Sequence, residues 1–188
     1  MNLPNKLTVL RVVLVPVFLV FLLVSGIPYN YSFAFLVFTA ASLTDLLDGN
    51  IARKRNLVTN FGKFLDPLAD KILVTGALIA FVELRLASCI AVIIIVTRDF
   101  IVSAIRLIAV NNGRVVAANI WGKLKTVIQM VTIISVLLAM QLSISFGWFS
   151  TDLVIKCSNI AVWVLAAVTA ISGWTYLAQN KDLISKDK

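Results

Sequence analysis

Long apolar segments alternate with short polar ones along the whole chain. Six segments approach the length that a helix needs to cross a bilayer, about 20 residues at a rise of 1.5 Å each. They cover residues 8–26, 31–53, 67–85, 87–109, 123–146 and 151–178. The pattern therefore predicts an all-α, polytopic membrane protein with six transmembrane helices.

The breaks between these segments refine the prediction. Three of them contain glycine, alone or with proline: Gly26 with Pro28, Gly113, and Gly147. Only residues 83–87 separate the third segment from the fourth, which predicts a tight hairpin. The polar start of the chain could form a short interfacial helix, capped by Asn2 or Asn5. Because no segment resembles a linker, we expect residues 1–188 to form one membrane-embedded domain.

Composition agrees with this picture. Hydrophobic residues make up 60% of the chain and charged residues only 14%, against about a quarter in soluble domains. The net charge of +8 would suggest nucleic acid in a soluble protein. Here the positive residues stand between apolar segments, so the expected partner is the anionic surface of a lipid bilayer and not nucleic acid. Cys89 and Cys157 lie in apolar segments and are expected to be small core residues.

The basic residues also predict an orientation. Most of them fall on alternate connections and at the two ends of the chain: Lys6, Arg11, Arg53, Lys54, Arg55, Lys63, Arg106, Arg114, Lys123, Lys125, Lys181, Lys186 and Lys188. The opposite side receives only Arg85 and Lys156. The positive-inside rule then places both termini in the cytoplasm, and an even number of spans requires the termini to share a side.

Four of the nine acidic residues fall in one stretch. Asp45 and Asp48 are three residues apart, and Asp66 and Asp70 are four apart, so each pair shares a helix face. A carboxylate at the bilayer centre costs about 2.5–3.5 kcal/mol, so something positive must offset four of them. The chain has no histidine, and carboxylate oxygens alone suit Mg²⁺ or Mn²⁺. Two such ions, about 3.5–4 Å apart, could clamp a phosphoryl group.

A simpler reading has these aspartates capping helices or pairing with neighbouring basic residues such as Arg53, Lys54 and Lys71. That reading explains one aspartate near a span end better than it explains four at this spacing. Gly49 and Gly62, taken singly, are better explained by close helix packing.

Residues 45–70 read Asp-x2-Asp-Gly-x2-Ala-Arg-x8-Gly-x3-Asp-x3-Asp. This stretch resembles the signature of the CDP-alcohol phosphotransferase family at every specified position. The resemblance implies a six-helix membrane enzyme, commonly a homodimer, that uses divalent metal ions to transfer a CDP-activated group to an alcohol. It implies that the metal ligands are Asp45, Asp48 and Asp66, with Asp70 as a further ligand and the general base. It also implies that the CDP moiety is held by Gly49, Ala52, Arg53 and Gly62.

Four further segments, residues 4–11, 61–71, 98–107 and 122–126, resemble the bacterial branch of that family that joins CDP-diacylglycerol to sn-glycerol 3-phosphate. This implies a bacterial cell membrane, with the active site on its cytoplasmic side. It also implies that the acceptor phosphate is held by Arg98, Arg106 and Lys123. That branch usually has glutamate after the arginine, whereas this chain has Asp99.

The residues themselves give partial support to this acceptor site. Arg98 lies mid-segment, where a charge needs a partner or a wet cavity, and an arginine fork suits phosphate. The alternative is a buried Arg98–Asp99 pair, although adjacent residues do not share a helix face.

Two other functions stay open at this point. The acceptor could be phosphatidylglycerol, inositol phosphate or serine. A protein of another class, a cation transporter, would also use intramembrane carboxylates, but its polar residues should cross the full membrane depth. A structural scaffold would leave the aspartates unexplained.

Overall fold

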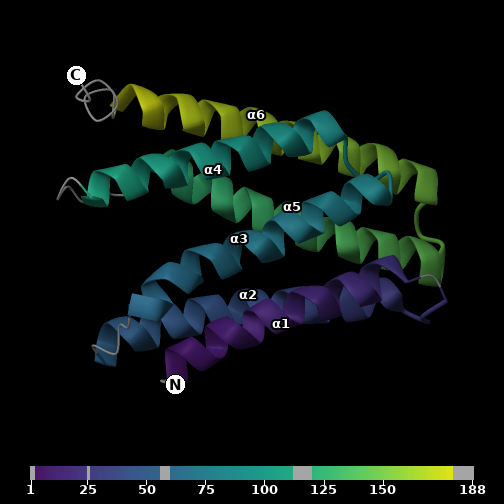
Figure 1. Cartoon of the computed structure of the whole chain (residues 1–188). Helices are drawn as coiled ribbons and strands as arrows, with labels where there is room; N and C mark the ends of the chain where they lie inside the picture. Colours follow the sequence, from purple (N-terminus) through teal and green to yellow (C-terminus); the bar gives the residue numbers. More distant parts are fainter. Residues whose placement is uncertain (1–2, 25, 56–59, 112–119, 180–188) are drawn as a thin grey trace. The chain divides into compact units, whose positions relative to one another are not determined.

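The computed structural model describes the backbone of residues 3–24, 26–55, 60–111 and 120–179, and the side chains of residues 8–24, 26–44, 69, 71–109 and 120–179. All six elements in this part of the chain are α-helices (Figure 1): α1 Leu3–Leu23, α2 Asn30–Arg55, α3 Asn60–Glu83, α4 Cys89–Asn111, α5 Ile120–Phe146 and α6 Thr151–Gln179. The described backbone contains no strand, and each predicted apolar segment coincides with one helix. The all-α prediction is therefore confirmed.

The N-terminal helix differs from its prediction. α1 runs unbroken from Leu3, so the polar residues at its start form its first turn and not a separate interfacial helix. Pro4 falls in that first turn, where its missing N–H has no intrahelical partner to lose. The helix continues through Lys6 without a break. Asn5 is therefore inside α1 and not its cap, while Asn2 lies outside the described residues.

The chain divides into two compact units. Unit 1 comprises residues 1–84 and 133–154, and unit 2 comprises residues 85–132 and 155–188. Unit 1 holds α1, α2 and α3, and unit 2 holds α4 and most of α6; α5 contributes to both. The expectation of one domain over residues 1–188 stays a prediction.

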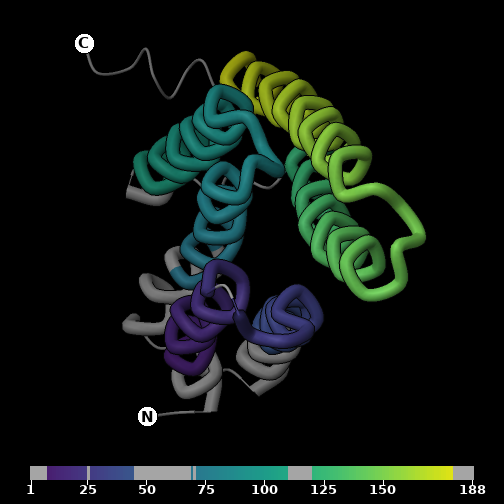
Figure 2. Tube along the Cα trace, turned by 90° about the vertical axis from the view of Figure 1, so that its right-hand side faces the viewer, coloured from purple at the N-terminus to yellow at the C-terminus, as the bar shows by residue number. Residues whose placement is uncertain are grey.

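In unit 1, α1 packs against both α2 and α3. Figures 1 and 2 both show α1 and α2 side by side. The rings of Phe18 and Phe38 lie 5.6 Å apart, and those of Phe21 and Phe33 lie 5.3 Å apart. Along α3, the backbone of Gly76 comes close to α1, since a Cβ added there would lie 3.6 Å from Val15. These contacts define the register of the three helices.

In unit 2, the connection between α3 and α4 is bound to α6. The hairpin is as short as predicted, because α3 ends at Glu83 and α4 begins at Cys89. Arg85 adopts a left-handed backbone with φ of 60°. Its carbonyl accepts a hydrogen bond of 3.1 Å from Asn159 Nδ2, and the Leu86 carbonyl accepts one of 2.7 Å from Ser158 Oγ. α6 thus provides hydrogen-bond donors for two backbone carbonyls of the turn.

Two of the predicted glycine breaks take left-handed backbone conformations. Gly26, between α1 and α2, has φ of 103°, and Gly147, between α5 and α6, has φ of 62°. A side chain would strain either position, so glycine ends these helices efficiently. Gly113 lies outside the described residues.

Of the described helices, α5 and α6 are long and apolar enough to cross a membrane. Only 44% and 33% of their most apolar windows are buried within the protein. The core helix of a soluble protein would be mostly buried, so these exposed apolar faces fit a lipid environment. The exposed side chains on these two helices include Val127, Val131, Leu138, Ile160, Val164 and Ile171.

The prediction that the cysteines are core residues is wrong. Cys89, at the start of α4, and Cys157, on α6, are both exposed free thiols. Apolar sequence neighbours did not indicate an inward face, because these helices are apolar on every side.

We predict that Ser158→Ala destabilises the protein by about 1–3 kcal/mol, because the buried Leu86 carbonyl loses its hydrogen-bond donor. The measurement is thermal unfolding of the purified chain in detergent. Ser135→Ala removes an exposed hydroxyl on α5 and is the matched control. Equal unfolding midpoints for the two variants would contradict the prediction.

Candidate active site

The four aspartates of the signature lie on two consecutive helices of unit 1. Asp45 and Asp48 are in the C-terminal half of α2, and Asp66 and Asp70 are in the N-terminal half of α3. Four residues, 56–59, connect the two helices. The end of α2 and the start of α3 lie at the same end of unit 1 as the start of α1 (Figure 1). The helix backbone therefore brings this stretch of sequence to one end of the three-helix unit.

The side chains of these aspartates lie outside the described part of the chain. The same holds for the residues expected at the CDP moiety, Gly49, Ala52, Arg53 and Gly62. Among the described side chains, no three histidine, cysteine, aspartate or glutamate residues could together hold a metal ion. The metal and CDP assignments therefore stay predictions.

Unit 2 contains a charged network around Asp99 on α4. The Asp99 carboxylate accepts a hydrogen bond of 3.1 Å from Arg98 Nη1 and one of 2.5 Å from Lys125 Nζ on α5. Arg98 Nη2 donates to Ser172 Oγ on α6 at 2.6 Å. Three helices of this unit are thus joined by four polar side chains.

Counted over the described side chains alone, the network carries one more positive charge than negative. The side chains of Lys125 and Arg98 are only 4% and 13% exposed. Burying a charge is costly unless it is paired, and one carboxylate must here pair with two cations. Arg98 Nε is also buried and has no hydrogen-bond partner among the described residues. This arrangement can attract an anion, and its unsatisfied donor is a group that a ligand oxygen could complete.

The structure separates the three basic residues that were expected at the acceptor phosphate. The pairing of Arg98 with Asp99, which sequence reasoning offered as the simpler explanation of Arg98, is present. The objection that adjacent residues do not share a face fails because the long arginine side chain reaches its neighbour. Arg106 and Lys123 are exposed and are not part of this network.

Sequence reasoning missed Lys125, Ser172 and Gly173. Lys125 follows Lys123 by two residues, or about 200° around a helix, so only one of the two can face the interior. Lys123 matched the family pattern, yet Lys125 is the buried residue. Helical periodicity applied to residues 120–132 was the available signal.

Gly173 lets α6 approach Arg98 closely. A Cβ added to Gly173 would lie 2.8 Å from Arg98 Cγ, which is closer than real Cβ atoms come to their neighbours. Beyond this point, Val102 and Ile105 of α4 and Tyr176 of α6 form a buried cluster. Val102 and Ile105 follow Arg98 by four and seven residues, and Tyr176 follows Ser172 by four. The same helix faces that carry the polar contacts therefore also carry the apolar ones.

Comparison with known proteins places these features in a family. Residues 1–177 match the model of the CDP-alcohol phosphatidyltransferase family. The chain is 42% identical over 190 residues to a protein of Bacillus subtilis (strain 168) named CDP-diacylglycerol–glycerol-3-phosphate 3-phosphatidyltransferase, covering 95% of each chain. Proteins of the same name match in Rickettsia bellii, at 36% identity over 96% of each chain, and in Haemophilus influenzae, at 38% over 70% of this chain and 73% of the relative.

We predict that Gly173→Ala lowers the unfolding midpoint, because its new methyl group displaces Arg98 from Ser172. The decisive comparison is a double-mutant cycle. In an Arg98→Ala background there is no side chain to displace, so the effect of Gly173→Ala should largely disappear. Gly76→Ala is the control, since its Cβ would make only ordinary contacts, the nearest at 3.6 Å. If Gly173→Ala lowers the unfolding midpoint equally with and without the Arg98 side chain, Gly173 does not act by making room for Arg98.

Proposed function

Because the chain belongs to the CDP-alcohol phosphatidyltransferase family, we propose that it transfers the phosphatidyl group of CDP-diacylglycerol to sn-glycerol 3-phosphate. The products are phosphatidylglycerophosphate and CMP, which would place the enzyme in phospholipid biosynthesis. The observation that carries this proposal is the near full-length similarity to relatives whose printed names state this donor and this acceptor. A cation transporter is not favoured by any of these similarities.

The donor set of the signature fits a pair of divalent cations. Asp45, Asp48, Asp66 and Asp70 offer only carboxylate oxygens, which suit Mg²⁺ or Mn²⁺. When bound, the ions would neutralise charge that builds on the diphosphate during transfer. Gly49, Ala52, Arg53 and Gly62 would hold the CDP moiety. Glycine and alanine allow a close approach of the ligand to the backbone, and the arginine fork can bind phosphate oxygens.

Asp70 is the proposed general base. The acceptor hydroxyl oxygen forms a bond to the phosphorus that carries the diacylglycerol, and the bond from that phosphorus to the CMP oxygen breaks. The hydroxyl proton passes to the Asp70 carboxylate. A carboxylate is a weak base for an alcohol, so the proton moves late, when the new phosphorus–oxygen bond has made the hydroxyl acidic.

Arg98, Arg106 and Lys123 are the proposed contacts of the acceptor phosphate. The surplus positive charge around Asp99 supports this assignment for Arg98, because a phosphate could balance it. Lys125 supports it indirectly by occupying the other oxygen of Asp99, which leaves Arg98 less completely neutralised. Arg106 and Lys123 are exposed and so free to meet a soluble acceptor.

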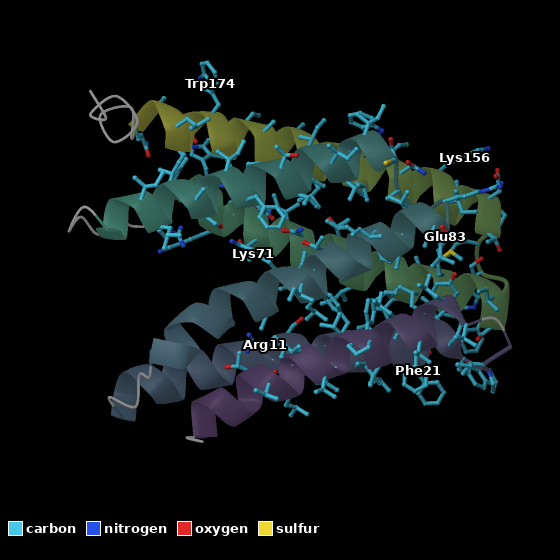
Figure 3. The ribbon with its side chains drawn as sticks, viewed as in Figure 1. Arg11, Phe21, Lys71, Glu83, Lys156 and Trp174 are labelled. Carbon is cyan, nitrogen blue, oxygen red and sulfur yellow. The ribbon has the colours of Figure 1, made fainter. Side chains whose placement is uncertain are left out.

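We further propose that all six helices cross a bacterial cell membrane, with both termini and the active site on the cytoplasmic side. Exposed aromatic residues near helix ends support this: Trp121 is the second residue of α5, Trp174 lies near the end of α6, and Trp148 lies between these helices. Trp174 points away from the protein in Figure 3. The 27 residues of α5 span about 40 Å, which matches a bilayer with its headgroups. The lipid tails of the donor could then stay in the bilayer during the reaction, in a homodimer as is common in this family.

Asp70→Asn should reduce turnover by about 10²–10⁴-fold, because the base is lost while the shape of the side chain is kept. The assay is CMP release from CDP-diacylglycerol and glycerol 3-phosphate, with Mg²⁺, with Mn²⁺ and with EDTA. Glu83→Gln removes an exposed carboxylate and serves as the control. Near wild-type turnover of Asp70→Asn would rule out the base assignment, and full activity in EDTA would rule out metal dependence.

Arg98→Met should raise the KM for glycerol 3-phosphate about tenfold or more, because a charge-assisted hydrogen bond to phosphate is lost. The KM for CDP-diacylglycerol should change little. Wild-type protein should turn over glycerol 3-phosphate faster than phosphatidylglycerol, inositol phosphate or serine. A different preferred acceptor would overturn the proposed reaction but leave the family unchanged.

A further inference from the structure

Arg11 is fully buried inside unit 1. Its side chain is 0% exposed, although it follows Leu10 and precedes Val12 in an otherwise apolar helix. Figure 3 shows Arg11 in the N-terminal half of α1, where that helix runs beside α2. Positive-inside placement does not explain this burial, because a residue that only marks the cytoplasmic side can keep its charge in water. A buried guanidinium needs compensating negative charge nearby.

The packing of α1 on α2 shows which residues are level with Arg11. These helices are antiparallel, so counting backward along α1 and forward along α2 by the same number of residues leads to residues at the same level. Arg11 is seven residues before Phe18, and Asp45 is seven residues after its partner Phe38. Counted from the pair Phe21 and Phe33, Arg11 is ten residues before Phe21 and Leu43 is ten residues after Phe33. Arg11 is therefore level with the turn of α2 that ends at Asp45.

The packing of α1 on α3 gives a matching answer. These two helices both start at the same end of unit 1 and run parallel (Figure 1). Gly76 lies between Val15 and Leu19 of α1, and thus level with Val17. Six residues back from Val17 is Arg11, and six residues back from Gly76 is Asp70. By the same steps, Asp48 and Asp66 fall about one helical turn further, near Thr8.

We infer that Arg11 supplies the positive charge that offsets the signature carboxylates. Two independent helix contacts place the backbone of Asp45 and of Asp70 at its level, and a fully buried guanidinium needs negative charge near it. Without cations, four carboxylates on neighbouring turns of two adjacent helices would repel one another. Arg11 would offset that repulsion until the cations bind, which makes it a positioning residue and not a catalytic one. The role before cation binding rests on the proposed metal site, whereas the electrostatic coupling of Arg11 to the aspartates does not.

The coupling of Arg11 to the aspartates is tested by thermal unfolding of the full chain in detergent with EDTA. Arg11→Met should lower the midpoint by about 10 °C, given the usual cost of breaking a buried pair in a chain of this size. Asp45→Asn and Asp70→Asn should each cost less stability in the Arg11→Met background than in the wild-type chain. Arg106→Met, which makes the same substitution at an exposed residue of α4, should leave the midpoint unchanged. Additive effects with both aspartates would overturn the inference.

If Arg11→Met does not fold, Arg11→Lys takes its place in the double-mutant cycles with Asp45→Asn and Asp70→Asn. Lysine keeps the charge but loses the two-pronged contact, so its midpoint should fall less, and its coupling to Asp45 and Asp70 should remain. If Arg11→Lys is as unstable as Arg11→Met and uncoupled to both aspartates, Arg11 acts through packing alone.

Adding Mg²⁺ or Mn²⁺ tests the positioning role separately. The cations should narrow the gap between wild type and Arg11→Met, because they replace the missing positive charge. A packing role predicts that the cations raise both midpoints by the same amount, and that result would overturn the role as countercharge. If the cations change neither midpoint, the proposed metal site fails, while the cycle in EDTA still decides whether Arg11 is coupled to the aspartates.

Discussion

The structure depends on the cost of placing charge among apolar helices. Water is not available to solvate an ion there, so each charge must have an opposite charge or a hydrogen-bond partner within reach. In unit 2 this constraint joins α4, α5 and α6 through Asp99, Arg98, Lys125 and Ser172. In unit 1 the same constraint applies to Arg11, whose side chain is fully buried. Both sites lie in segments that carry the family resemblance.

The pairing of buried charges also requires close packing of the helices, which explains the placement of small residues. A guanidinium can reach a hydroxyl on the next helix only if the two backbones are near each other, and Gly173 provides that room. In unit 1, Gly76 and buried alanines such as Ala34, Ala41 and Ala77 let three helices approach closely. Hydrophobic association is weak among helices in lipid, so packing and polar contacts carry much of the specificity.

The sequence predicted the number and location of the helices because segment length and hydropathy determine them. It did not predict which side of each helix faces inward, since helices that are apolar on every side carry little periodic signal. The exposed Cys89 and Cys157 show this. The aspartate spacing was readable without coordinates, because residue type and separation along a helix are properties of the sequence itself. The Arg98–Asp99 contact could be offered from the sequence only as an alternative, since it depends on the conformation of a long side chain.

The hydrogen bonds from α6 to the α3–α4 turn affect the order in which the protein forms. The Arg85 and Leu86 carbonyls are made early in synthesis, but their donors, Asn159 and Ser158, follow more than 70 residues later. Until then the nascent hairpin must satisfy these carbonyls with water or lipid headgroups, which keeps its tip at an interface. Unit 2 can therefore close only when the final helix arrives, and a ribosome stalled before α6 would leave a membrane intermediate whose turn is still hydrated.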